Sequence, residues 1–326
     1  LWPISTLGWP HETEDLKTFY PTQFLSTAPE ILFFWVARMI MSGLYFKGKI
    51  PFSKVYLHST VCDSQGRKMS KSLGNGIDPL EAVDEYGADS LRFTILYLAP
   101  VGQRIRLAKN SFDIGFRFAN KLWNASRLIF MNAEGVSLKP IKEVPLNLWD
   151  QWILNELEAM TEKTARDLES FRFNEVVENL YHFIWSRFCD WYLEIAKIRL
   201  YSQNPEEKQA ALSVLFFVLE KSLRLLHPIM PFITEEIWQK LPNKKGPSIM
   251  KADYPVSEGL SFAGAEKPIA LIQELIYHVR NIRGDMGVTP DKKVPVLISA
   301  ADAQIRDLLK ASEEEIKILA KISDLE

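Results

Sequence analysis

Cysteine is scarce in this chain of 326 residues, which contains only Cys62 and Cys189. The two lie far apart in the sequence and neither belongs to a Cys-x-x-Cys pair, so they cannot supply a zinc site. Isolated cysteines of this kind are typical of a reducing compartment, in which they remain free thiols. We therefore expect a cytoplasmic protein with no protein-bound metal.

Long apolar runs and an excess of charge are also missing. The longest apolar stretches are well short of a membrane span, and the first residues do not form a signal peptide, so we expect no membrane partner. The formal net charge is −2, so any nucleic-acid surface must be local. With 47% hydrophobic and 25% charged residues the chain is typical of a globular protein, and its length predicts two or three domains.

One short segment, Lys68–Ser72 with the sequence KMSKS, carries recognisable chemistry. Glycines stand on both sides of it, at Gly66 and Gly74. Such a mobile cationic loop suits a polyphosphate, because lysines bind phosphate oxygens, hydroxyls donate hydrogen bonds and glycine lets backbone amides approach. Two lysines three positions apart are by themselves more often solvated surface residues. The full pentapeptide followed by Leu-Gly-Asn is far rarer and favours the nucleotide interpretation.

The first 106 residues predict an α/β region. The apolar stretch Glu30–Tyr45 is long enough for a buried helix, and Val55–Val61 is rich in β-branched and aromatic residues, as in a strand. The KMSKS segment follows this strand, and Pro79–Tyr86 and Ala88–Leu98 then predict helices. This order fits the second half of a doubly wound, Rossmann-like α/β domain, in which ligands lie at the carboxyl ends of the strands.

From about residue 107 the pattern becomes helical. Apolar residues recur every three or four positions along Phe173–Leu200 and Ala210–Leu226, and a short helix is predicted near Thr234. We interpret this part as an antiparallel helix bundle.

The last part of the chain predicts a small α/β unit. Ile269–Arg283 and Ala303–Ala320 are helix candidates, and Val294–Ser299 is a strand candidate. The predicted domains are residues 1–106, 107–250 and 251–326, the last of them truncated.

The KMSKS segment resembles the second nucleotide-binding motif of class I aminoacyl-tRNA synthetases. The wider sequence is similar to the valine-specific branch of that family, in family order, over about the first three quarters of the chain. The matching stretches are Leu1–Pro10, Asp15–Pro21, Ile31–Met41, Gly87–Phe93, Phe118–Arg127, Trp185–Glu194 and Leu226–Phe232.

The resemblance implies a two-step reaction. Valine and ATP, the latter as its Mg²⁺ complex, form valyl-adenylate and pyrophosphate, and the valyl group then moves to tRNA(Val). Lysines that contact the departing pyrophosphate most strongly in the transition state lower the barrier. We expect Lys71 and Lys68 to be catalytic, and Met69, Ser70 and Ser72 to share the ATP site with them.

Three further positions are candidates by resemblance. His58 falls where the family lines its ATP pocket, although Ser59 replaces the usual glycine and a histidine bonded only to nearby backbone is an alternative. Glu30 stands where the family carries an aspartate, and a carboxylate there would bind the ammonium group of the amino acid. Its alternative role is that of an acid in a first helical turn. Trp35 could form an apolar wall for the valine side chain, or simply belong to the core.

The stretch 103–127 is locally basic and contains aromatic residues. This composition suits RNA, since it combines phosphate attraction with base stacking, and the family's helix bundle binds the anticodon arm. A solvated basic helix face would look the same. The candidate tRNA-binding residues are Arg117, Asn120, Lys121, Trp123 and Arg127.

Two parts of the family's machinery are not found in this sequence, namely the first ATP motif (His-Ile-Gly-His or similar) and the editing domain. The chain also starts without methionine, inside a family motif, so we expect a piece of a longer polypeptide that is inactive alone and monomeric. Two alternatives remain, a fragment of an isoleucine enzyme and a non-catalytic tRNA-binding module.

Overall fold

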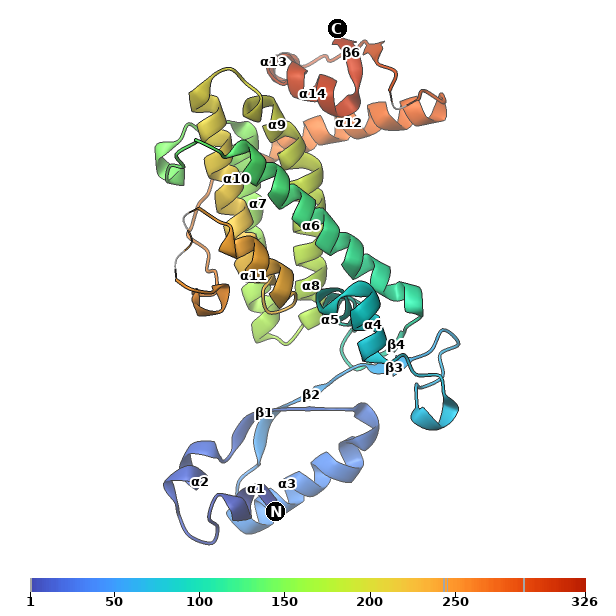
Figure 1. Cartoon of the computed structure of the whole chain (residues 1–326), viewed down its shortest axis with the longest axis vertical. Coiled ribbons are helices and arrows are strands. Elements are labelled where there is room, and N and C mark those ends of the chain that lie inside the picture. The colour runs from blue at the N-terminus through green and yellow to red at the C-terminus, as the bar shows by residue number, and fades with distance from the viewer. Residues whose placement is uncertain (1, 243, 245, 290) are drawn as a thin grey trace. The chain divides into compact units, whose positions relative to one another are not determined.

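The computed structural model describes residues 2–242, 244, 246–289 and 291–326. Leu1, where the first matching stretch begins, and the side chain of Lys71 lie outside this description. The chain divides into two compact units. Unit 1 comprises Leu1–Gly115 and Asp167–Val177, and unit 2 comprises Phe116–Arg166 and Glu178–Glu326. Figure 1 follows the chain through both units by colour.

Unit 1 begins with a parallel β-helix-β arrangement. Its elements are α1 (Trp2–Thr6), α2 (Glu14–Phe19), β1 (Thr22–Thr27), η1 (Pro29–Ile31), η2 (Leu32–Val36), α3 (Ala37–Lys47) and β2 (Phe52–Leu57). Strands β1 and β2 pair in parallel, from Thr22 opposite Phe52 to Thr27 opposite Leu57. Parallel strands require a crossover connection, and the helical segment between them supplies it.

This crossover helix corrects one expectation from the sequence. Residues Pro29–Lys47 are helical as predicted, but only 11% of their apolar window is buried. Phe33 is 79% exposed and Tyr45 is 84% exposed. The segment is also long and apolar enough to cross a membrane by length and composition, contrary to our reading of the sequence, although one such helix is weak evidence for a span.

A second parallel pair of strands follows directly in unit 1. Its elements are β3 (Thr60–Cys62), η3 (Lys71–Leu73), α4 (Pro79–Tyr86), α5 (Ala88–Tyr97), β4 (Arg104–Arg106) and η4 (Lys109–Phe112). Thr60 of β3 lies opposite Arg104 of β4. The predicted strand Val55–Val61 is therefore divided between β2 and β3 at His58 and Ser59, whereas the two predicted helices are confirmed.

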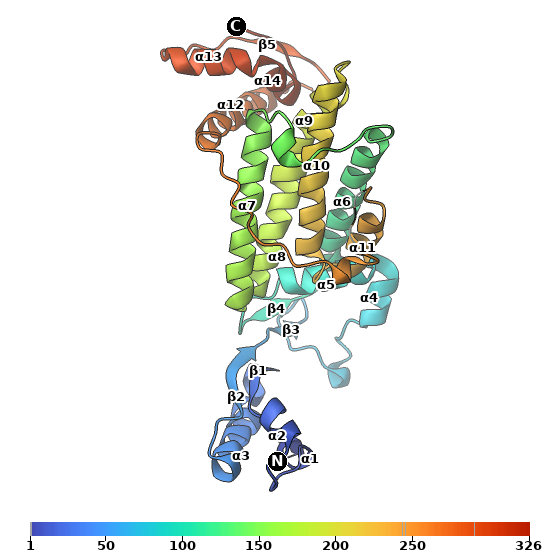
Figure 2. The ribbon, with the colours of Figure 1, turned by 90° about the vertical axis from the view of Figure 1, so that its left-hand side faces the viewer.

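Long helices make up most of the next region. They are α6 (Asp113–Asn132), η5 (Ile141–Glu143), α7 (Leu148–Glu169), α8 (Phe173–His182), the π-helical segment η6 (Phe183–Leu193), α9 (Glu194–Leu200), α10 (Pro205–Leu226) and α11 (Pro231–Gln239). The continuous helix predicted over Phe173–Leu200 is confirmed, with a π-helical middle. In unit 2, α7, α9 and α10 lie side by side in both views (Figures 1 and 2). Short turns join α7 to α8 and α9 to α10, so neighbouring helices run antiparallel.

A buried polar cluster fixes the packing of these helices. Asp150 of α7 is fully buried. Its carboxylate accepts a hydrogen bond from an Arg199 nitrogen at 2.8 Å and another from the Tyr192 hydroxyl at 2.6 Å. Burial and the neighbouring Asp150 carboxylate raise the pKa of Tyr192 well above its usual value. Because each member satisfies another in a dry environment, the cluster specifies one arrangement of α7 and the η6–α9 segment.

Unit 2 ends in a small α/β arrangement with η7 (Ile249–Lys251), α12 (Glu266–Asp285), β5 (Val294–Val296), α13 (Ala303–Ala311), α14 (Glu313–Ala320) and β6 (Ile322–Leu325). Strands β5 and β6 are parallel. The prediction of a single helix over Ala303–Ala320 is wrong, because the helix is interrupted at Ser312. Three glutamates follow Ser312 directly, and acidic side chains stabilise the start of a new helix through its dipole.

Candidate functional site

The KMSKS segment lies in a loop at the carboxyl end of strand β3. Its first half folds back on this strand as a hairpin, in which Lys68 forms an antiparallel bridge with Cys62 and the Met69 amide donates to the Val61 carbonyl at 3.2 Å. Gly66 lies at the tip with φ of +81°, and Gly74 has φ of +62°, a region that favours glycine. The two glycines noted in the sequence therefore permit the two tight changes of direction in this loop.

Polar side chains connect the two ends of the loop. Asp63, at the end of β3, is buried and accepts hydrogen bonds from the backbone amides of Gln65 (3.0 Å) and Arg67 (2.9 Å). Asn75, twelve residues later, donates to the other carboxylate oxygen of Asp63 at 2.9 Å. This bond from Asn75, with the contacts of Arg67, lowers the pKa of Asp63 to about 2.

Lys68 and Glu30, two of the predicted site residues, form an ion pair with each other. Glu30 lies in the middle of the turn η1 after β1, and Lys68 lies in the loop after β3, so the segments that follow these two strands bring a carboxylate and an ammonium group together. Thr60 lies beside them, with its hydroxyl 3.5 Å from a Glu30 oxygen. The hydrogen bond from Lys68 lowers the pKa of Glu30. Both side chains are substantially exposed, so charged ligands can compete with the pair.

The middle of the motif is anchored by an apolar side chain. Met69 packs against a cluster formed by Ala82, Ile105, Leu107 and Phe112. A cavity of about 750 Å³ adjoins it, lined by loop residues between Met69 and Asp78 and by apolar side chains of β3, α5 and η4. The hydroxyls of Ser70 and Ser72 lie 3.2 Å apart, and the Ser70 hydroxyl accepts from the Leu73 amide at 3.4 Å. The backbone of Lys71 begins the turn η3.

His58 and Trp35 lie in the same unit. His58 is exposed between β2 and β3, and its Nδ1 atom lies 3.1 Å from the Ser59 carbonyl, as the backbone-bonded alternative requires. Ser59, which replaces the family's glycine, donates to the Pro100 carbonyl at 2.6 Å. Trp35 is 58% exposed in η2, so it is not a core residue in this structure.

The predicted tRNA-binding residues divide into two groups on α6. Arg117, Asn120, Trp123 and Arg127 are exposed and recur at three- or four-residue spacing, so they share one helix face. The ring of Trp123 is also in contact with Lys240, whose ammonium lies 4.5 Å from the ring centre.

Lys121, four residues after Arg117, borders this face, but its side chain contacts residues of η6. It forms an ion pair with Asp190, and its ammonium stands 4.2 Å from the centre of the Trp185 ring. This side chain is therefore partly committed within the bundle.

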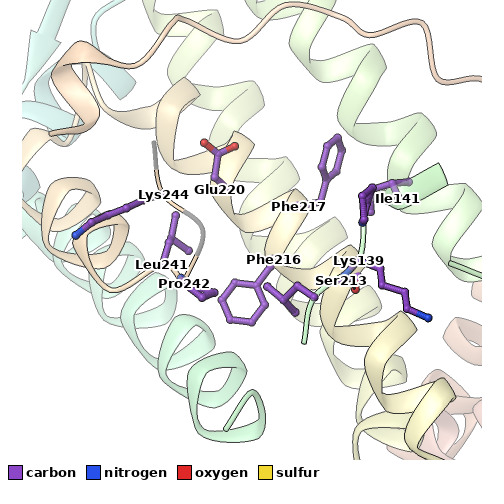
Figure 3. A pocket seen from close by; sticks show the side chains of 11 residues that line it. Lys139, Ile141, Ser213, Phe216, Phe217, Glu220, Leu241, Pro242 and Lys244 are labelled. Atoms are coloured by element: carbon purple, nitrogen blue, oxygen red, sulfur yellow. Dashed lines mark hydrogen bonds between the residues drawn. The ribbon is translucent and has the colours of Figure 1, made fainter. Parts of the chain in front are cut away.

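A second cavity, of about 200 Å³, lies in unit 2 where the segment before α7 meets α10 and the residues that follow α11 (Figure 3). Phe216 and Phe217 contribute most of its aromatic lining, and Ser213 accepts a hydrogen bond from the Lys139 amide. No motif in the sequence pointed to this cavity. In the described part of the chain, no group of three or more His, Cys, Asp or Glu side chains is arranged to hold a metal ion.

Sequence reasoning missed Asp63, Asn75 and Thr60. Asp63 and Asn75 bracket the motif, one directly after the strand and one directly after the second glycine, and that position was the available signal. Their mutual hydrogen bond depends on the folded loop and could not be read from the spacing.

Two family models match the chain. Residues 1–108 match tRNA synthetases class I (I, L, M and V), and residues 150–298 match the anticodon-binding domain of tRNA ligase. The whole chain is 49% identical to a valine–tRNA ligase of Geobacter sulfurreducens and 48% identical to one of Thermotoga maritima. It spans 37% and 36% of their lengths, respectively.

Solved structures share the fold. The LeuRS of Agrobacterium radiobacter, in a ternary complex with tRNA and LeuAMS, matches with a TM-score of 0.59 and 18% identity, over 94% of this chain and 36% of that one. The methionyl-tRNA synthetase of Mycobacterium tuberculosis with methionyl-adenylate matches with a TM-score of 0.62 and 18% identity, over 72% of this chain and 47% of that one. At this level of identity the likeness concerns the fold alone.

Proposed function

Since this chain belongs to the class I tRNA synthetases, we propose that it is the part of a valine–tRNA ligase that carries the KMSKS loop and the anticodon-binding helices. The enzyme joins valine to the AMP part of ATP with release of pyrophosphate, and then transfers the valyl group to tRNA(Val) with release of AMP. The observation that supports this most is a KMSKS loop at the carboxyl end of a parallel strand, in a chain that matches valine–tRNA ligases from end to end.

The architecture of unit 1 supports a nucleotide-binding role. Its two parallel β-helix-β arrangements are what the second half of a Rossmann-like domain contains, and ligands of such domains bind at the carboxyl ends of the strands. The KMSKS loop and Glu30 both follow such strand ends.

The chemistry of the loop suits the first step of the reaction. As the valine carboxylate attacks the α-phosphorus of ATP, charge accumulates on the departing pyrophosphate, and Lys68 and Lys71 stabilise it. Ser70 and Ser72 donate hydrogen bonds to phosphate. Lys68 exchanges its Glu30 partner for a phosphate oxygen, and Glu30 is then available for the ammonium group of valine. His58 and Trp35 line the adenosine and valine sides of the site.

The exposed face of α6 is the RNA-binding surface in this proposal. Arg117 and Arg127 supply positive charge, and Trp123 supplies a ring on which a base can stack. Changing Arg117 and Arg127 together to alanine weakens tRNA binding and lowers the slope of log K against log salt by about 1 for each lost phosphate contact. Lys121→Ala has a smaller effect on the slope because that lysine already pairs with Asp190. An unchanged slope in the double variant contradicts this surface.

The exposed apolar helix of unit 1 supports the view that the chain acts within a longer polypeptide. The exposed apolar side chains of this helix include Phe33, Phe34, Trp35, Met41 and Tyr45, and large exposed apolar patches mark interaction sites. We propose that other parts of the ligase cover this helix, and that the cytoplasmic, monomeric enzyme needs them for activity.

ATP–pyrophosphate exchange by the full-length polypeptide tests the function. We expect exchange with valine and much weaker exchange with isoleucine, and loss of exchange in Lys71→Ala with tRNA(Val) binding retained. Exchange that prefers isoleucine indicates the related enzyme instead. A wild-type protein that binds tRNA(Val) without any exchange would be a tRNA-binding module and would refute the ligase assignment.

A further inference from the structure

We propose that Asn75 and Asp63 are positioning residues that hold the KMSKS loop in the shape required for pyrophosphate departure. This inference rests on the proposed function, and it concerns two residues that do not themselves contact the phosphates. The argument follows from how the first three residues of the motif are held.

Asn75 forms hydrogen bonds to the backbone of Lys68 and Ser70, and we call this pair of bonds the clasp. Its side-chain oxygen accepts from the Ser70 amide at 3.0 Å, and its side-chain nitrogen lies 3.3 Å from the Lys68 carbonyl. One side chain therefore bonds the backbone on both sides of Met69, between two residues expected to contact phosphate. Because these bonds are made to the backbone, they fix the positions from which the Lys68 and Ser70 side chains extend.

Asp63 connects this clasp to the rigid strand. The nitrogen of Asn75 that reaches Lys68 also donates to Asp63 at 2.9 Å. Asp63 is buried, and its carboxylate accepts hydrogen bonds from the backbone amides of Gln65 and Arg67 and from the Arg67 guanidinium. These bonds hold the carboxylate from several directions. It follows β3 directly, and the loop is thereby tied to the sheet at both of its ends.

The clasp divides the loop into a fixed and a less constrained part. Residues 68–70 are held by Asn75, by the Val61 carbonyl and by the packing of Met69. The turn η3 (Lys71–Leu73) lies beyond these contacts and is followed by Gly74, whose φ is +62°. In such a loop, the turn η3 can rearrange around a nucleotide while the backbone of Lys68 stays in place. Positioning of this kind acts on catalysis, since small displacements of a charged group reduce transition-state stabilisation steeply.

A charge-swap series in the full-length ligase tests the proposal. Asn75→Asp places a second carboxylate where Asn75 now donates to Asp63, so the like charges repel and the clasp opens. We expect kcat of ATP–pyrophosphate exchange to fall roughly 10- to 100-fold with KM for ATP changed little, because a misplaced group affects the transition state more than ground-state binding. Asp63→Asn combined with Asn75→Asp restores a donor–acceptor pair and recovers at least about 5-fold of the loss.

Two further measurements make the result decisive. Amide hydrogen exchange over residues 64–75 is expected to accelerate in Asn75→Asp and to slow again in the double variant. Asn281→Asp, which adds the same charge at an exposed position on α12, serves as the matched control and leaves both readouts unchanged.

Either of two results overturns the inference. One is an Asn75→Asp enzyme with wild-type kcat, and the other is a double variant no better than the single one. If the wild-type enzyme shows no exchange with valine, the proposed function fails instead, and hydrogen exchange still decides whether the clasp holds the loop.

Discussion

Two apolar helices of this chain have opposite environments. In α10, 14 of the 22 residues are buried, among them Leu215 and Leu219 at 0% exposure. In α3, which continues the apolar stretch from Pro29, the only buried residue is Gly43. The sequence predicted a buried helix over Glu30–Tyr45 and a helix of an antiparallel bundle, with one apolar stripe, over Ala210–Leu226. The difference shows that an apolar sequence pattern predicts burial of a helix, but not which part of the polypeptide packs against it.

The largest effect is expected from the buried charges of the bundle. Asp150→Ala leaves Arg199 and the Tyr192 hydroxyl without their partner in a dry environment, so we expect unfolding to become easier by about 3–5 kcal/mol. Urea denaturation of the chain, monitored by circular dichroism at helical wavelengths, measures the change. Asp150→Asn, which keeps the shape and one acceptor but removes the charge, should lose less but still a measurable amount, and an Asp150→Asn variant as stable as the wild type would count against the charge pairing.

A smaller effect separates the two helices themselves. Leu219→Ala on α10 removes a fully buried side chain and should cost about 3 kcal/mol. Leu44→Ala on α3, where the side chain is half exposed, should cost less than about 0.5 kcal/mol in this chain. In the full-length polypeptide we expect the cost of Leu44→Ala to rise, because α3 is then covered. A cost that stays near zero there would show that nothing packs on this helix.

Thiol chemistry provides an independent probe of burial in the bundle. Burial raises the pKa of Cys189 to about 12, so at pH 8 the thiolate form that reacts with alkylating reagents is almost absent. We expect alkylation at Cys189 to be slow in the folded chain and fast in urea, as followed by peptide mass spectrometry. Rapid labelling of Cys189 in the folded protein would show that the bundle opens locally.

The smallest effect is expected at the exposed ion pair of unit 1. Glu30→Gln removes the partner of Lys68 but should change stability by less than about 1 kcal/mol, because both side chains are solvated. The pKa of Glu30 is lowered by Lys68, so this small contribution is present above the unfolded pKa near 4.5 and is lost as the pH falls through the folded value. Thermal unfolding at pH 7 and pH 3 measures both, and a large loss at pH 7 would mean that the pair is structural.

Much of the fold could be predicted from particular residues. The periodicity of Phe173–Leu200 and Ala210–Leu226 predicted the long helices, and the glycines around the KMSKS segment predicted a loop, in which Gly66 and Gly74 have positive φ. The helix predicted over Ala303–Ala320 was wrong because its periodicity continues through Ser312, whereas the backbone does not. Local pattern does not report such a break when both halves are amphipathic.

The candidate site was predictable in its residue types but not in its contacts. The motif identified Lys68, Ser70 and Ser72, and it indicated a phosphate-binding loop. It did not indicate that Lys68 would pair with Glu30, which lies 38 residues away, or that Asp63 and Asn75 would close the loop. The first contact depends on how the segments after β1 and β3 come together, and the second on the return of the chain at Gly66, and neither is local in sequence.

The sequence by itself determined the helical periods, the position of the KMSKS loop after a strand and the family to which the chain belongs. These features depend on residue types at short spacing, which the chain carries wherever it folds. Tertiary structure alone decided that Asn75 clasps Lys68 and Ser70, that Lys121 turns to Asp190, and that α10 is covered in this chain whereas α3 is not. Those outcomes depend on which distant surfaces come together, because hydrogen-bond geometry and burial are properties of the folded chain.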